Sequence, residues 1–294
     1  MPDVEPVNTR AVLTSIATLF ATSSRIDPDS RRDAQREARL LAAGVLDVSP
    51  GTLARTLDAP LTHDQQARIF AAARRRANGE PLAYALGSAA FRHLVLHVDA
   101  RVLIPRPETE IVVEAALAVT AQRAGGTAVD IGTGSGAIAI ALATEGHFDH
   151  VWATDISRDA LDVAIANYAR QPAGTTPVTF ASGADFAPLF GVKARVIVSN
   201  PPYIAYSEAA ALPASVRDWE PSTALFAADN GMARYDVLLA GAAAYLEPDG
   251  WLVLEVDARR AAETMARAVH HGFVNVRLMR DLSHRDRVLV AQVA

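Results

Sequence analysis

Apolar residues change their spacing along the chain, and the change separates a helical part from an alternating one. In residues 1–85 they recur at intervals of three and four, which is typical of amphipathic helices. Asp29 or Ser30 is expected to cap the second of these helices, and Thr62 a later one that closes at Asn78-Gly79. The pattern predicts a small helical bundle at the N-terminus.

Residues 86–106 alternate apolar and polar positions, which predicts a β-hairpin that links the bundle to residues 107–294. From residue 127 onward, strand and helix patterns alternate, which indicates a mainly parallel sheet covered on both faces. Strands are expected at Thr127–Ile131, His150–Thr154, Val178–Ala181, Arg195–Ser199, Trp251–Val256, Asn275–Leu278 and Arg287–Ala291. Helices are expected at Ser135–Glu145, Arg158–Arg170, Met232–Leu246 and Ala258–His271. The last two strands are joined by a short loop, so they should pair antiparallel.

A glycine-rich loop follows the first of these strands and opens a helix. It contains Gly132, Gly134 and Gly136, and Asp155 ends the next strand. Glycines let the backbone turn tightly and let a ligand approach it, and a carboxylate in the position of Asp155 can bind both hydroxyls of a ribose. A dinucleotide and S-adenosyl-L-methionine both fit this pattern. Asp130, directly before the loop, favours S-adenosyl-L-methionine, because a carboxylate attracts an amino-acid ammonium and repels a pyrophosphate.

The tetrapeptide Asn200-Pro201-Pro202-Tyr203 begins where an apolar strand ends. Ligands of open parallel sheets bind at this edge, outside the carboxyl ends of the strands. The Asn200 oxygen and the Pro201 carbonyl can accept both hydrogens of a substrate –NH2, and Tyr203 can pack against its planar group. Asn-Pro and Pro-Pro also occur in rigid turns. After a glycine loop and at a strand end, the tetrapeptide instead predicts methylation of a planar nitrogen.

Composition and charge narrow the possible locations and partners. The chain has no cysteine, no apolar run near the roughly 18 residues of a membrane span and no secretory signal pattern, so we expect a cytoplasmic protein without membrane contact. Its net charge is -5, so it has no global cationic field for nucleic acid, and we expect no direct binding to DNA. The eight histidines show no metal-ligand spacing, so no metal is expected. The basic run Arg74-Arg75-Arg76 is interpreted as a solvated helix end favoured by the helix dipole, with contact to a release factor or ribosomal RNA as the alternative.

Over nearly its whole length the sequence resembles the HemK/PrmC family, the peptide chain release factor N5-glutamine methyltransferases. The tetrapeptide alone is shared with methyltransferases of DNA bases, whereas the segment Pro105-Arg106-Pro107-Glu108-Thr109-Glu110 is much more specific. The matching stretches are Gly79 to Tyr84, Val102 to Glu110, Asp130 to Gly136, Val198 to Ile204, Glu220-Pro221 with Ala224-Leu225, and Asp281-Leu282 with Asp286-Arg287.

The resemblance implies a class I, Rossmann-like methyltransferase domain behind a helical domain that docks the release factor. It implies that S-adenosyl-L-methionine methylates the side-chain amide nitrogen of the GGQ glutamine in bacterial class I release factors. Catalytic and substrate contacts are expected from Asn200, Pro201, Pro202 and Tyr203, with Arg106 and Glu110 as further substrate candidates. Cofactor contacts are expected from Asp130, Gly132, Thr133, Gly134, Ser135, Gly136, Asp155, Ile156, Asp185, Phe186 and Asn200, with Asp185 and Phe186 beside the adenine.

Three other functions remain as alternatives. A ribosomal-protein glutamine methyltransferase, or a specialised paralogue, would keep the pocket and change its client. The related ribosomal-protein enzymes usually differ after the first Pro-Arg, so Pro107 to Glu110 favours release factors. An adenine-N6 DNA methyltransferase should carry a target-recognition insertion and a basic cleft, and neither is visible. A dinucleotide-dependent oxidoreductase would share the glycine loop, but the sequence offers no evident acid or base for hydride transfer.

Overall fold

The computed structural model describes residues 8–294, which form two compact units. The first unit contains the chain up to Ser88 together with Ala211–Glu220. The second contains Ala89–Ala210 and Pro221–Ala294. The short segment Ala211–Glu220 therefore leaves the second unit and joins the helical one, which the sequence pattern did not indicate.

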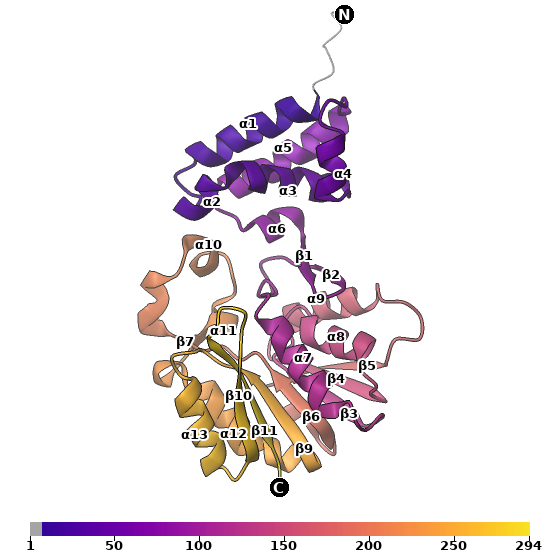
Figure 1. Cartoon of the computed structure of the whole chain (residues 1–294), viewed down its shortest axis with the longest axis vertical. Coiled ribbons are helices and arrows are strands. Elements are labelled where there is room, and N and C mark those ends of the chain that lie inside the picture. The colour runs from indigo at the N-terminus through magenta and orange to yellow at the C-terminus, as the bar shows by residue number, and fades with distance from the viewer. Residues whose placement is uncertain (1–7) are drawn as a thin grey trace, which may run out of the picture. The chain divides into compact units, whose positions relative to one another are not determined.

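The first unit is helical, and its three longest helices enclose an apolar core. Ile16 and Phe20 of α1 pack with Leu41 of α3 and Ile69 of α5. The helices are α1 (Thr9–Thr22), α2 (Pro28–Arg32), α3 (Ala34–Leu46), α4 (Pro50–Arg55), α5 (His63–Ala77), α6 (Leu82–Leu86) and α10 (Ala214–Arg217). Figure 1 shows α1, α3 and α5 lying alongside one another.

Side chains at the helix starts explain where these helices begin. Thr62 and Gln65 form a reciprocal capping box at α5, as the threonine predicted. The cap expected at Asp29 or Ser30 is wrong, because the Asp27 side chain accepts from Ser30 N and Pro28 opens α2. The fixed φ of proline suits a first helical position, so the cap is Asp27, two residues before Asp29.

Arg76 lies inside the helical unit, so the interpretation of the basic run as a solvated helix end is wrong for this residue, whereas Arg74 and Arg75 are exposed. Its side chain is 3% exposed, and its guanidinium pairs with Glu37 at 2.8 Å and with Asp27 at 3.7 Å. Arg75 is bound to Glu80, with 2.8 Å between Nε and Oε2. The guanidinium groups of Arg75 and Arg76 therefore form ion pairs within the helical unit.

The second unit contains the predicted seven-stranded sheet, in the order β10-β11-β9-β6-β3-β4-β5. Strands β9, β6, β3, β4 and β5 are parallel, and β11 pairs antiparallel with both β9 and β10. The bounds are β3 (Thr127–Ile131), β4 (His150–Asp155), β5 (Val178–Ser182), β6 (Ala194–Ser199), β9 (Leu246–Glu255), β10 (Val274–Arg280) and β11 (Asp286–Gln292). The Rossmann-like fold and its antiparallel edge are confirmed.

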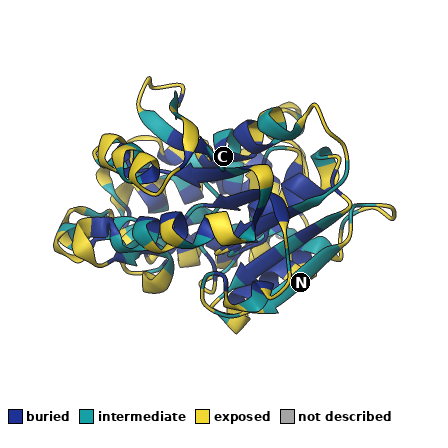
Figure 2. Ribbon diagram, turned by 90° about the horizontal axis from the view of Figure 1, so that it is seen from below, coloured by how far each residue is buried: buried dark blue, intermediate teal, exposed yellow. Residues whose placement is uncertain are grey.

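Helices cover both faces of this sheet and bury two separate cores. Helices α7 (Thr109–Thr120) and α8 (Ala137–Glu145) pack on one face, and α12 (Ala233–Tyr245) and α13 (Ala261–His270) pack on the other. Helix α9 (Arg158–Tyr168) contacts β4 and β5. Figure 2 shows the strands mostly in the colour of buried residues, as expected for a sheet covered on both sides.

The predicted hairpin consists of β1 (Ser88–Phe91) and β2 (Leu94–His97). Arg92 in its turn attaches it to two helices, because its backbone N–H donates to Glu110 Oε1 at 2.9 Å and its guanidinium pairs with Glu145 at 2.6 Å. Short elements complete the second unit: β7 (Ile204–Ala205), β8 (Phe226–Ala227), α11 (Ser222–Leu225) and the 3-10 turns Ala187–Leu189, Tyr206–Ala211 and Asp229–Gly231. Between residues 8 and 294, no helix is both long enough and apolar enough to cross a bilayer.

Candidate active site

The two sequence motifs meet at the carboxyl edge of the sheet, where β3 and β6 are neighbours. Helix α8, which follows β3, lies on one face, whereas α12, which follows β6, lies on the other. Chain connections that leave adjacent strands in opposite directions open a crevice, which is the usual ligand site of such sheets. A cavity of about 320 Å³ occupies this place, and residues of both motifs line it.

Within the glycine loop, two glycines face this cavity and one does not. Gly132 and Gly134 line the cavity with positive φ angles of 76° and 54°, and a Cβ added to either would have no atom within 4 Å. A Cβ on Gly136 would instead lie 2.9 Å from Ile140 Cδ1 and 3.1 Å from Ala164 Cβ. Gly136 therefore serves close packing at the start of α8, and Gly132 and Gly134 leave a cradle open for a ligand.

Asp155 and Ile156 also line the cavity, as the sequence predicted. The Asp155 carboxylate accepts from Gly134 N at 2.9 Å and from Ser157 N at 2.8 Å. A carboxylate offers about four acceptor positions, so capacity remains for the hydroxyls of a ribose. Ile156 is 68% exposed, which is high for an apolar side chain and leaves apolar surface open at the cavity.

Asp130 lies beneath the glycine loop and does not line the cavity. It accepts from Thr133 Oγ1 at 2.6 Å and from Ala139 N at 3.1 Å, so it ties the loop to α8. Burial raises the pKa of Asp130 to about 7. Its Oδ1 is buried and accepts no hydrogen bond from the described residues, so the expected contact with an amino-acid ammonium stays a prediction beside this supporting role. Ser135 is buried as well, and its carbonyl accepts from Asn167 Nδ2 at 2.9 Å.

Of the two residues expected beside the adenine, the structure brings one to the cavity. Asp185 lines it and is ion-paired with Arg234. Phe186 is 8% exposed and stacks on Tyr245 in the core, with ring centroids 4.9 Å apart and planes at 13°. The expectation for Phe186 is thus corrected, because its ring fills the space under α12 against Gly241. Ile156 is an exposed apolar side chain on the cavity wall.

The tetrapeptide is held at its first and last residues. Asn200, Pro201 and Pro202 line the cavity, and the preceding Ser199 hydroxyl donates to the Ile131 carbonyl at 2.6 Å. Asn200 Nδ2 donates to Thr109 Oγ1 at 3.1 Å.

Tyr203, expected to pack against the substrate, is not among the residues that line the cavity, and it packs against the core beneath α12 and α13. Its hydroxyl donates to Glu255 Oε1 at 3.2 Å, and burial followed by the charge of Glu255 raises the pKa of Tyr203. Gly231 lies so close to the Tyr203 carbonyl that an added Cβ would overlap it. Tyr203 therefore anchors the loop.

The substrate candidates Arg106 and Glu110 do not belong to the cavity lining. Glu110 is bound to the hairpin through Arg92. The sequence interpretation did not identify Leu103 and Tyr206, which do line the cavity. Tyr206 is 67% exposed and stacks on Phe226, with ring centroids 5.4 Å apart. A tyrosine three residues after the tetrapeptide is visible in the sequence, and its position could have predicted this part of the cavity wall.

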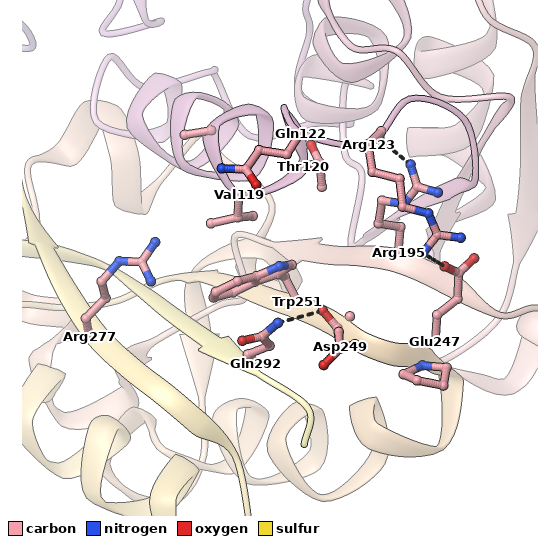
Figure 3. Close-up of a pocket in the computed structure, with 13 residues that line it drawn as sticks. Val119, Thr120, Gln122, Arg123, Arg195, Glu247, Asp249, Trp251, Arg277 and Gln292 are labelled. Atoms are coloured by element: carbon pink, nitrogen blue, oxygen red, sulfur yellow. Dashed lines mark hydrogen bonds and ion pairs between the residues drawn. The ribbon is translucent and has the colours of Figure 1, made fainter.

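A second cavity, of about 480 Å³, lies near the first residues of β6 and beside β9 (Figure 3). Arg277 lies over the Trp251 ring at 5.4 Å, and Arg123 approaches Glu247 at 3.5 Å. None of the sequence-predicted site residues lines this cavity. The chemistry of both motifs therefore assigns the active site to the cavity at the carboxyl edge.

The sheet order, the glycine loop and the Asn-Pro-Pro-Tyr loop at the neighbouring strand end define the class of S-adenosylmethionine-dependent methyltransferases. Family models described as the PrmC N-terminal domain and the methyltransferase small domain match residues 21–87 and 109–214. The release factor glutamine methyltransferase of Xylella fastidiosa is 40% identical over 94% of this chain and 97% of its own. That of Moorella thermoacetica is 40% identical over 87% of this chain and 90% of its own.

The chain belongs to the release factor glutamine methyltransferase family. A solved methyltransferase from Pyrococcus furiosus covers 79% of this chain and 98% of its own, with a TM-score of 0.52 and 19% identity. At that identity the likeness concerns the fold alone.

Proposed function

We propose that this protein transfers a methyl group from S-adenosyl-L-methionine to the side-chain amide nitrogen of the glutamine in the GGQ motif of peptide chain release factors. The observation that carries the proposal is the single cavity shared by Gly132, Asp155 and Asn200. A cradle suited to the methyl donor beside a tetrapeptide suited to an amide supports this reaction. Family membership supplies the client, because the relatives that match nearly the whole chain bear that name.

The residues on the cavity wall fit the cofactor. Gly132 and Gly134 leave space for close approach, Asp155 retains acceptor capacity for ribose hydroxyls, and Ile156 offers an apolar surface for the adenine. When bound, S-adenosyl-L-methionine supplies an electrophilic methyl group and leaves as S-adenosyl-L-homocysteine. Asp130 contributes indirectly, because it holds the turn that presents the two glycines.

The tetrapeptide prepares the poor nucleophile. An amide nitrogen delocalises its lone pair, so it reacts when its two hydrogens are held and the lone pair is directed at the methyl carbon. Asn200 Oδ1 and the Pro201 carbonyl are acceptors at the cavity wall, and Pro201 and Pro202 have no N–H that would compete for them. Positioning of this kind contributes several kcal/mol, up to about 7–11 in the best intramolecular reactions.

Mass spectrometry of purified release factor, incubated with the enzyme and S-adenosyl-L-methionine, tests the proposal. One methyl group should appear on the GGQ glutamine, and none on a release factor whose GGQ glutamine is replaced by alanine. Asn200→Ala should abolish most turnover and leave the circular dichroism spectrum unchanged. Methylation of a ribosomal protein instead of the release factor would overturn the proposed client and favour the ribosomal-protein alternative.

We further propose bacterial class I release factors as the clients, the cytoplasm as the site of action and the helical unit as the docking element. A match of the PrmC N-terminal domain family to residues 21–87 supports the last point. Deletion analysis would perturb folding, so the docking is best mapped by crosslinking of the full chain to the release factor. Crosslinks confined to the second unit would contradict docking through the helical unit.

A further inference from the structure

A buried carboxylate is linked to both ends of the tetrapeptide, to Tyr203 directly and to Asn200 through Thr109. Glu255, the last residue of β9, is 1% exposed. Its Oε1 accepts from the Tyr203 hydroxyl at 3.2 Å, and its Oε2 accepts from the Thr109 hydroxyl at 2.6 Å. Thr109 opens α7, is itself buried and accepts from Asn200 Nδ2 at 3.1 Å. Three segments far apart in the sequence therefore meet at one hydrogen-bonded chain.

The order of donors along this chain is fixed by its members. A threonine hydroxyl has one hydrogen to donate, and Thr109 donates it to Glu255 Oε2. Once Thr109 donates to Glu255, its oxygen can only accept from Asn200. The Asn200 amide must then present its NH2 group to Thr109 and its Oδ1 to the other side.

The direction of this amide matters because asparagine has two nearly equivalent orientations. Its terminal torsion is broad and roughly two-fold, so an unsupported side chain populates both. With Oδ1 toward the cavity, the side chain accepts a hydrogen from a substrate –NH2. With the NH2 group toward the cavity, two donors would face each other and the grip would be lost.

We propose that Thr109 and Glu255 are positioning residues that set the Asn200 amide with its oxygen toward the substrate amide. The inference rests on the proposed methyl transfer and specifies how one of its acceptors is oriented. Glu255 also holds Tyr203, so the same carboxylate fixes the end of the loop that carries Pro201 and Pro202. Neither Thr109 nor Glu255 lines the cavity, which distinguishes them from residues that touch the substrate.

Steady-state kinetics of three variants test the proposal, with release factor as substrate. Thr109→Val keeps the shape and removes the hydroxyl, and kcat should fall about tenfold, as one lost orienting hydrogen bond implies. The KM for S-adenosyl-L-methionine should change by less than about twofold, which is small beside the roughly tenfold fall in kcat. Thr109→Ser restores a hydroxyl that can donate the same hydrogen bond, so it should recover at least about half of the wild-type kcat. Glu255→Gln can donate to Thr109 and so permits the reversed amide, and it should also lower kcat.

Thr264→Val is the matched control, because Thr264 is fully buried and its hydroxyl donates to the carbonyl of Arg260, the N-cap of α13. It should keep wild-type kcat. The proposal is overturned if Thr109→Val and Glu255→Gln retain wild-type kcat, if Thr109→Ser is as slow as Thr109→Val, or if Thr264→Val is equally slow.

A readout independent of turnover separates this inference from the proposed function. In ¹⁵N-labelled wild-type protein, the Nδ2 hydrogens of Asn200 should exchange slowly with water, and Thr109→Val should accelerate their exchange. Identical exchange in both proteins would refute the orientation. A wild-type enzyme that leaves the release factor unmethylated, but shows this protection, would remove the proposed substrate and retain the arrangement of the amide.

Discussion

Alanine substitutions at Gly136 and Gly134 should have different effects, although both glycines lie in one loop with positive φ. The angles are 84° at Gly136 and 54° at Gly134. An L-residue in this region costs about 1–2 kcal/mol, and the loss of glycine's freedom in the unfolded chain returns about 0.4–1 kcal/mol. Gly134→Ala should therefore lower the free energy of unfolding by about 1 kcal/mol, since its Cβ meets no neighbour.

At Gly136 the new methyl group also overpacks the junction with α9. It would lie 2.9 Å from Ile140 Cδ1 and 3.1 Å from Ala164 Cβ, and overpacking of a core costs about 1–3 kcal/mol. Gly136→Ala should thus lose about 2–4 kcal/mol in total. Its methyl group does not enter the cavity, whereas that of Gly134→Ala does.

Urea denaturation and calorimetric titration with S-adenosyl-L-homocysteine separate the two effects. Tryptophan fluorescence can follow the unfolding, because Trp152 and Trp251 belong to the second unit. Gly136→Ala should show the larger loss of stability, and Gly134→Ala the larger loss of affinity measured in the folded protein. Equal losses of stability, or wild-type affinity in Gly134→Ala, would refute the assignment of one glycine to packing and the other to the ligand.

Two further variants, Arg76→Met and Asp130→Asn, test buried charge. Arg76→Met should lower the free energy of unfolding by about 3–5 kcal/mol, because it leaves Glu37 and Asp27 without their buried partner. Arg10→Met, which breaks an exposed pair with Asp58, should cost less than about 1 kcal/mol, and equal losses in urea titrations would contradict the argument. The pKa of Asp130 is raised from 3.8 to about 7, so the wild type should lose stability between pH 4 and 7, as the unfolded chain ionises while the folded protein stays protonated. Asp130→Asn should therefore gain in urea midpoint relative to the wild type from pH 5 to pH 8, and a constant difference would speak against this linkage.

The periodicity of the sequence was sufficient for the sheet, because strands buried on both faces are short apolar runs between helices. Element boundaries were less accurate where a single backbone angle decides them. The helix expected from Ser135 begins at Ala137, since Gly136 is left-handed and cannot be its first turn. The helix expected from Ala258 begins at Ala261. Such angles depend on neighbours that periodicity does not report.

Most of the predicted site residues come together in loops at one sheet edge, but the direction of individual side chains could not be predicted. Asp130 and Ile156 both follow the rule that site residues lie at strand ends. Ile156 lines the cavity, whereas Asp130 turns beneath the loop toward Thr133 and Ala139. Phe186 was predicted to lie beside the adenine because it follows Asp185 in the sequence. Its ring instead stacks on Tyr245, which lies in α12. A contact between distant segments cannot be inferred from spacing alone.

Thr109 and Glu255 are separated by 146 residues. The sequence contains a signal for Glu255 but none for its contact with Thr109. An acidic residue at the end of the apolar strand β9 signals a function, because a buried carboxylate costs free energy unless it is well bonded. Burial does raise the pKa of Glu255. An apolar residue there would be cheaper for the fold, yet the Thr109 hydroxyl could then donate to Asn200 Oδ1 and reverse the amide. Within the hydrogen-bonded chain, the carboxylate is therefore the group that gives the Asn200 amide a single direction. Because its burial costs free energy, we infer that it acts by orienting Asn200 rather than by stabilising the fold.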